Sequence, residues 1–135
     1  MQLQRIDHVV FTVRDIDRAC DFYGRVLGME VVTFAEGRKA LQFGQCKINL
    51  HAYGKEFEPK AAHPAPGTQG ICVISDTPLP DAMRNLERAG LEVLEGPVER
   101  NGALGRIESV YLRDPDGNLI EIACYVERSP IQKPE

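Results

Sequence analysis

Three side chains that can bind a metal ion, His8, His51 and Glu121, each lie within a run of residues typical of a β-strand. Two neutral imidazoles and one carboxylate form a ligand set that suits Fe, Mn, Ni, Co or Zn and leaves coordination positions open for water or substrate. Taken singly, a strand histidine is more often a hydrogen-bonded structural residue, and a glutamate more often faces solvent or a cation. The prediction of one divalent metal ion therefore depends on a fold that brings the three residues together.

The elements that would position these residues form a repeat, and its first half begins with a strand. Residues 6–13 are β-branched and aromatic, which predicts a strand. Asp15 or Asp17 can cap a helix whose apolar residues recur at helical spacing, and Gly28 provides its stop. Residues 29–32 indicate a second strand. The first half thus opens as strand, helix, strand.

The same order recurs in the second half of the chain. Residues 71–74 predict a short strand, an apolar stripe at helical spacing follows, and Gly90 stops the helix. Residues 91–94 then indicate the next strand. Gly90 stands at the same distance from its preceding strand as Gly28 does in the first half. We infer from this spacing that the chain contains a duplicated module.

Each half then ends in a predicted β-hairpin. The turn of the second hairpin, Asp-Pro-Asp-Gly-Asn at 114–118, is rich in residues that favour tight turns. The strands of the two hairpins are expected at 39–43 and 47–51 in the first half, and at 109–112 and 119–122 in the second. The pattern of each half is therefore β-α-β-β-β.

Two βαβββ modules predict an α+β fold in which an open, cupped sheet surrounds a metal cleft, because each helix covers one sheet face and leaves the other free. The second module would carry a longer loop at 96–105. We expect a single domain over 1–135, composed of module one at 4–53, a linker loop at 54–69, module two at 70–126 and a loose tail at 127–135.

Alternation along the strands places the three candidate ligands on the faces that the helices leave free. Successive strand residues point to opposite faces, so His8 shares a face with Val10 and Thr12. His51 and Glu121 stand opposite the apolar positions of their own strands. They would also occupy the same place in the two hairpins, and a repeat with a pseudo-twofold axis brings such positions close together.

Composition excludes several functional classes. The chain of 135 residues is 43% hydrophobic and 27% charged, with a formal net charge of −4, which is typical of a globular domain. That acidic balance disfavours nucleic acid and anionic membranes as partners. We find no apolar run long enough to span a bilayer and no signal-peptide pattern, so we expect a cytoplasmic protein. The four cysteines are too widely spaced for a zinc knuckle or a redox motif.

Three segments, 6–9, 22–29 and 114–121, are similar to signatures of the vicinal oxygen chelate superfamily, which includes glyoxalase I, fosfomycin-resistance thiol transferases, extradiol dioxygenases and bleomycin-binding proteins. The resemblance extends over about residues 4–126. Within the superfamily, the segment 50–57 and the loop 60–67 look like small glyoxalase-domain proteins, some of them described as virulence-associated. The resemblance is more specific for fold than for reaction.

The resemblance implies metal ligands on the first and last strands of each module, which here are His8, His51, Gly70 and Glu121. Gly70 departs from the pattern, since glycine has no side chain to coordinate a metal. Three ligands are the number that the resemblance implies for the dioxygenases and fosfomycin enzymes. His63, in the linker loop, is an alternative source of a fourth ligand.

The activity that the resemblance implies is a metal-dependent lyase or isomerase reaction, similar to lactoylglutathione lyase, on a small oxygen-bearing substrate. The metal would stabilise an oxyanion or enolate, with Glu121 as the catalytic group that moves the proton. A ring-cleaving dioxygenase or a fosfomycin-type thiol transferase is the alternative, and a non-catalytic protein that sequesters an antibiotic is the second. A homodimer is expected. Possible contacts for an anionic substrate group are Arg38, Lys47, Tyr53 and Arg106.

Overall fold

The computed structural model describes residues 1–128; residues 129–135, most of the predicted loose tail, lie outside them. The described chain divides into two compact units. Unit 1 comprises Met1–Gln69 together with the turn Asp114–Asn118, and unit 2 comprises the remaining segments from Gly70 onward. No helix among residues 1–128 has the length and apolar character needed to cross a bilayer.

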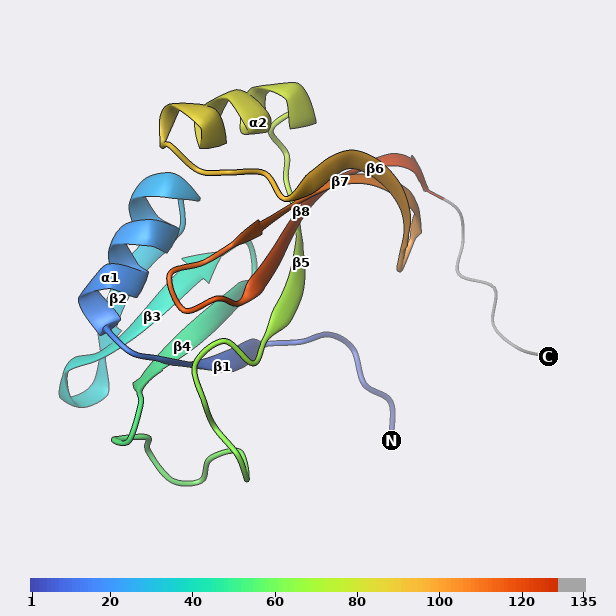
Figure 1. The fold of residues 1–135 in the computed structure, drawn as a ribbon. Coiled ribbons are helices and arrows are strands. Elements are labelled where there is room, and N and C mark those ends of the chain that lie inside the picture. Colours follow the sequence, from blue (N-terminus) through green and yellow to red (C-terminus); the bar gives the residue numbers. More distant parts are fainter. Residues whose placement is uncertain (129–135) are drawn as a thin grey trace. The chain divides into compact units, whose positions relative to one another are not determined.

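Unit 1 contains the first β-α-β-β-β pattern. Its sheet has the order β1-β4-β3-β2, in which β1 runs parallel to β4 and the other neighbours are antiparallel. The helix α1 covers one face of this sheet (Figure 1). The elements are β1 (His8–Val13), α1 (Ile16–Asp21) with its π-helical continuation Phe22–Val26, β2 (Glu30–Phe34), a 3-10 turn (Ala35–Gly37), β3 (Arg38–Phe43) and β4 (Cys46–Ala52).

The helix of unit 1 begins where the sequence predicts. The Asp15 side chain accepts a hydrogen bond from the backbone N–H of Arg18 at 3.1 Å, which satisfies one of the free donors at the helix start. Gly28, with a φ of 75°, takes the left-handed conformation that ends the helical segment. The core between helix and sheet is built from fully buried side chains, among them Phe11, Val13, Tyr23, Leu41 and Ile48.

Unit 2 repeats the topology, with the sheet order β5-β8-β7-β6 and β5 parallel to β8. Its helix α2 contacts β7. The elements are β5 (Gly70–Ile74), α2 (Leu79–Arg88), β6 (Glu95–Gly102), β7 (Gly105–Arg113) and β8 (Leu119–Arg128). The predicted α+β class with two βαβββ modules is therefore confirmed. β8 also continues to Arg128, beyond the predicted end of the module at 126.

Two predictions in unit 2 are wrong. Residues 91–94 form no strand, and the segment 96–105, expected as a loop, contains most of β6 and its turn into β7. β6 is an outer strand that begins with a register shift between Glu95 and Val98, around Pro97. Proline is tolerated at a strand start or bulge, and an outer strand has no need of apolar alternation. For these reasons the polar, glycine-rich sequence of β6 did not predict the strand that forms there.

The turn Asp114–Asn118 is held within unit 1 by buried polar groups. The Asp114 carboxylate accepts hydrogen bonds from the Tyr23 hydroxyl at 2.6 Å and from the Asn118 amide at 2.8 Å. Asn118 in turn accepts one from the backbone N–H of Gln69 at 2.9 Å, and Asp116 accepts one from the backbone N–H of Arg14 at 2.9 Å. The turn thus fixes the end of the loop 54–69, which borders the site described next.

Candidate functional site

His8 and His51 lie on the same face of the unit 1 sheet but at different positions along the strands. His8 pairs with Lys47, and Thr12 pairs with His51, so the two histidines are four residues apart along adjacent parallel strands. That offset corresponds to about 13 Å at ~3.3 Å per residue. Two imidazoles bonded to one ion at ~2.1 Å cannot span this separation while both project from the sheet. Within unit 1, His8 and His51 therefore do not share one metal ion.

The pairing register also corrects the repeat inferred from the hairpins. Glu121 lies two residues beyond the β8 partner of Gly70, and Asn49 lies two residues beyond the β4 partner of His8. Because His8 and Gly70 hold the same position in the two modules, the counterpart of Glu121 is Asn49 and not His51. The turns of the two hairpins differ in length. Residues counted from these turns, such as His51 and Glu121, are therefore not at equivalent positions in the two modules.

His8 is about half exposed, and its Nδ1 lies 2.8 Å from the Asp7 carboxylate. The hydrogen bond with His8 is the main reason that the pKa of Asp7 is lowered. A carboxylate on one ring nitrogen is the usual support of a metal-binding histidine, since it orients the other nitrogen. His8 thus has the local surroundings of a ligand.

Glu121 belongs to unit 2, on β8. The Ser109 hydroxyl donates a hydrogen bond to its Oε2 at 2.6 Å. Burial, together with the charge of Glu121, raises the pKa of the Cys72 thiol to about 11. Cys72 and Glu121 line a pocket of about 590 Å³ with Arg100, Tyr111 and other residues of unit 2.

Among residues 1–128, no three His, Cys, Asp or Glu side chains are grouped as a bound metal ion requires. The two predicted histidine ligands belong to unit 1, and the predicted carboxylate ligand, Glu121, belongs to unit 2. A metal site that joins Glu121 to one of the histidines stays a prediction.

A second pocket, of about 450 Å³, lies within unit 1, between the free face of β1 and β4 and the loop 54–69. It brings together two histidines that the sequence analysis treated separately, His51 and His63. The polar residues that line it are Thr12, His51, Lys60, His63, Thr68 and Gln69. The apolar ones are Val9, Val10, Pro59, Ala61, Pro64 and Ala65. Mixed walls with a few converging polar groups are typical of small-molecule sites.

His51 is one of the two buried polar residues of this pocket, with only 9% of its surface exposed. No hydrogen bond joins its ring to any other residue within 1–128. Burial, followed by the positive charge of Arg38, lowers the pKa of His51, while Glu56 acts in the opposite direction. The ring is therefore neutral at pH 7 and keeps a nitrogen lone pair for a ligand or a proton.

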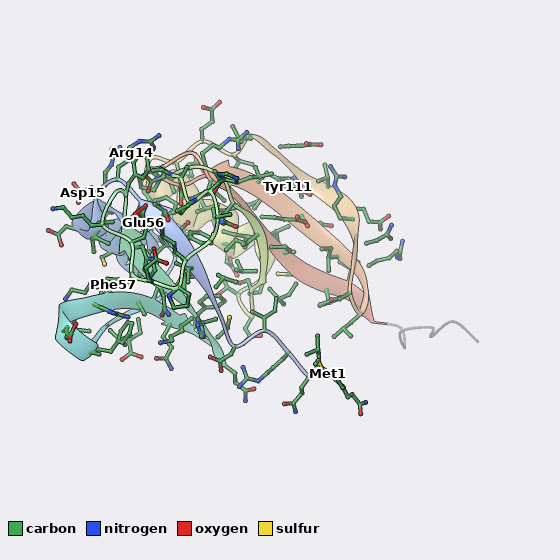
Figure 2. All side chains as sticks on the ribbon, turned by 90° about the horizontal axis from the view of Figure 1, so that it is seen from below. Met1, Arg14, Asp15, Glu56, Phe57 and Tyr111 are labelled. Atoms are coloured by element: carbon green, nitrogen blue, oxygen red, sulfur yellow. The ribbon has the colours of Figure 1, made fainter. Side chains whose placement is uncertain are left out.

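An aromatic cap on the loop after β4 shields His51. The Phe57 ring packs edge-on against the His51 ring, with centroids 5.4 Å apart, and the Arg38 guanidinium lies 3.6 Å from the Phe57 centroid. Glu56 and Phe57 are neighbours on this loop (Figure 2). The cap explains both causes of the lowered pKa, since it buries the imidazole and holds a cation near it.

Two buried polar atoms on unit 1 have no hydrogen-bond partner in the described part of the chain: Arg38 Nε and Asn49 Oδ1. Unpartnered buried atoms are uncommon, and they are often found where a ligand or water completes the site. The sequence indicates Arg38 only as a possible anion contact and gives no local signal for Asn49. The strand register identifies Asn49, because Asn49 holds the same position in module one that Glu121 holds in module two.

Comparison with known proteins gives close relatives over nearly the whole chain. Virulence protein STM3117 of Salmonella typhimurium is 55% identical over 93% of this chain and 88% of its own length, and its crystal structure superposes with a TM-score of 0.92 over 93% of this chain and 100% of that one. Glyoxalase domain-containing protein RDO1 of Mycosarcoma maydis is 53% identical over 93% of this chain and 70% of its own length.

A more distant relative, the lactoylglutathione lyase of Pseudomonas putida, is 26% identical over 86% of this chain and 82% of its own length. The family model described as the Glyoxalase/Bleomycin resistance protein/Dioxygenase superfamily matches residues 5–122. This match spans both βαβββ modules and bears out the resemblance seen in the sequence. The chain therefore belongs to the Glyoxalase/Bleomycin resistance protein/Dioxygenase superfamily.

Proposed function

We propose that this chain is an enzyme of the lyase or isomerase type, which binds a small oxygen-bearing molecule in the unit 1 pocket and moves a proton on it with His51. One observation carries the proposal: His51 is buried, neutral at pH 7 and without a hydrogen-bond partner among residues 1–128, and it lines a pocket of ligand size. A structural histidine normally uses a ring nitrogen in a hydrogen bond to the protein, whereas the ring nitrogens of His51 remain available to a ligand in the pocket.

The neighbours of His51 supply the other elements of proton-transfer chemistry. Thr12 pairs with His51 across the strands and lines the pocket, and its hydroxyl makes no hydrogen bond to another residue in the described chain. The Gln69 side chain also lines the pocket. These two groups can donate hydrogen bonds to a substrate carbonyl and stabilise negative charge that develops on its oxygen. The apolar walls limit the access of water.

The proton balance is that of an isomerisation. His51 takes a proton from the carbon next to the substrate carbonyl and returns it to the neighbouring atom, so no oxidant or second substrate is consumed. A lyase step of the same kind would return the proton to a leaving group. Lactoylglutathione lyase is the name of one distant relative, and it supports this reaction class.

The divalent metal predicted from the sequence does not fit within either unit. In unit 1, His8 and His51 lie too far apart to share an ion, and in unit 2, Glu121 is the one predicted ligand present. No step of the proposed mechanism therefore runs through a metal ion. The combination of His8 with Glu121, the homodimer and the cytoplasmic location stay predictions.

The test is a substrate screen coupled to one pair of variants. The hemithioacetal of methylglyoxal and glutathione, fosfomycin with a thiol, and catechols represent the three reaction classes. We expect turnover with the hemithioacetal or a related hydroxycarbonyl compound, and a decrease of kcat by about 10²–10⁴-fold in His51→Gln. Lys55→Met, at an exposed position outside the pocket, should retain full activity.

Oxygen-dependent cleavage of a catechol or thiol transfer to fosfomycin would replace the proposal with another reaction class. Unchanged turnover in a folded His51→Gln protein would remove His51 from the mechanism.

A further inference from the structure

The charge of the unit 1 pocket contrasts with that of the whole chain. Lys60 and two histidines line the pocket, and no aspartate or glutamate is among its lining residues. The chain as a whole has 20 acidic residues against 16 lysines and arginines. Among the lining residues, Lys60 is the one side chain with a full charge at pH 7, so the charge that the pocket offers to a ligand is positive.

From this contrast we infer that the ligand of the unit 1 pocket is a small organic carboxylate, with its charged end at Lys60 and its carbon chain against Val9, Val10 and Pro64. The inference rests on the proposed function, which places the substrate in this pocket, and it names the substrate class. Half of the lining residues are apolar. A compact inorganic ion would leave these apolar side chains in contact with water, whereas a carbon chain would cover them.

Lys60 remains available for such a ligand. It lies 3.4 Å from Glu58, but both side chains are partly exposed, at 38% and 74%, and ion pairs of this kind are weak. An ammonium has three donors, so one contact with Glu58 leaves others for the carboxylate. Arginine, the residue best suited to a doubly charged phosphate, is not among the lining residues. These features favour a singly charged carboxylate over a phosphate.

The other polar groups place the second oxygen of the ligand. The Thr68 hydroxyl already donates a hydrogen bond to the Ala65 carbonyl, at 2.9 Å. The Thr12 hydroxyl has no such partner among the described residues, and it lies beside the buried His51 ring. Thr12 and His51 are therefore left to contact an oxygen on the carbon chain of the ligand, away from the carboxylate at Lys60.

Equilibrium binding to the full chain, followed by amide NMR shifts, tests the inference without turnover. The probes are butyrate, its neutral isostere butyramide, and inorganic phosphate. We expect butyrate to shift the resonances of Val10, Thr12 and Lys60, and to bind about 10-fold more tightly than butyramide, the affinity ratio that a single charged contact provides. Higher salt should weaken the binding of butyrate and leave that of butyramide unchanged.

A matched pair of lysine variants on the same loop locates the charge. Lys60→Met should reduce the affinity for butyrate to that for butyramide. Lys55→Met, at an exposed position outside the pocket, should leave both affinities unchanged. Since both variants keep the backbone of the loop intact, a folded Lys60→Met protein is expected.

Equal binding of butyrate and butyramide, tighter binding of phosphate, an unaffected Lys60→Met variant, or no binding of butyrate at millimolar concentration would each overturn the inference. The outcome is separate from that of the proposed function. If the protein prefers butyrate but shows no turnover, the carboxylate site stands and the proposed enzymatic function is wrong. If turnover depends on His51 but butyrate does not bind, the proposed function stands and the carboxylate site is wrong.

Discussion

The hydroxyl of Tyr23 donates a 2.6 Å hydrogen bond to the carboxylate of Asp114, which comes from the far end of the sequence. Tyr23 is fully buried, and Asp114 is nearly so. Burial, followed by the charge of Asp114, raises the pKa of Tyr23 far above its usual value, so the hydroxyl keeps its proton and remains a donor. This bond joins the helix of unit 1 to the turn 114–118.

Removal of that hydroxyl should destabilise the protein. Tyr23→Phe leaves one side of a buried carboxylate without its donor, which costs about 1–3 kcal/mol of the free energy of unfolding. Urea unfolding of the two proteins measures the difference. Tyr53→Phe, where the residue is 59% exposed, serves as the control and should stay within about 0.5 kcal/mol of the wild type. Equal losses in both variants would contradict a special role for the Tyr23–Asp114 bond.

Two asparagines of unit 1 should respond in opposite ways to the same substitution. Asn118 is buried and uses both ends of its amide, toward Asp114 and Gln69, so Asn118→Leu should cost about 2–4 kcal/mol. Asn49 keeps a buried carbonyl oxygen without a partner, so Asn49→Leu should be neutral or stabilising. Thermal unfolding of the two variants provides the comparison. A large loss in Asn49→Leu would mean that the oxygen is satisfied in solution.

Acid should weaken the fold through His51. Because the pKa of His51 is lowered in the folded state, the unfolded chain takes up a proton as the pH falls below about 6.5, while the folded chain does not. Stability should therefore fall between pH 7.5 and pH 5.5, and His51→Gln should lose less over that range. Urea midpoints at the two pH values measure this difference, and NMR titration of the His51 ring gives its pKa directly. Identical pH dependence in both proteins would speak against the lowered pKa.

Metal analysis can separate the roles of the two strand histidines. The register excludes His51 from an ion that is held by His8, so His51→Ala should keep the metal content of the wild type. His8→Ala should lose metal if His8 and Glu121 are ligands, as the sequence predicts. Elemental analysis of the purified proteins gives the stoichiometry. Loss of metal in His51→Ala would restore His51 to the ligand set.

The sequence predicts the two modules well because their signals are local. The cap at Asp15, the stop at Gly28 and the turn at 114–118 each act over a few residues, and the structure has all three in place. The outer strand β6 escaped prediction because its polar sequence has no buried face to impose alternation. The local rules thus work wherever one side of an element is buried.

The candidate site was harder to predict because it depends on long-range register. The alternation of side chains correctly placed His8 and His51 on one face, but only the pairing of β1 with β4 sets their separation along the strands. The pocket depends on the loop 54–69, whose course has no periodic signal. The sequence named His51 and His63 individually, and the fold of this loop makes them neighbours in one site.

The turn 114–118 completes unit 1 although it is encoded within the second repeat. A polypeptide made of the first repeat alone would leave the Tyr23 hydroxyl and the Gln69 amide without the acceptors they use here. Its own hairpin turn, at Gly44-Gln45, is too short to offer a second set of such acceptors. A fragment that ends before residue 114 would therefore lack part of the hydrogen-bonded core of unit 1.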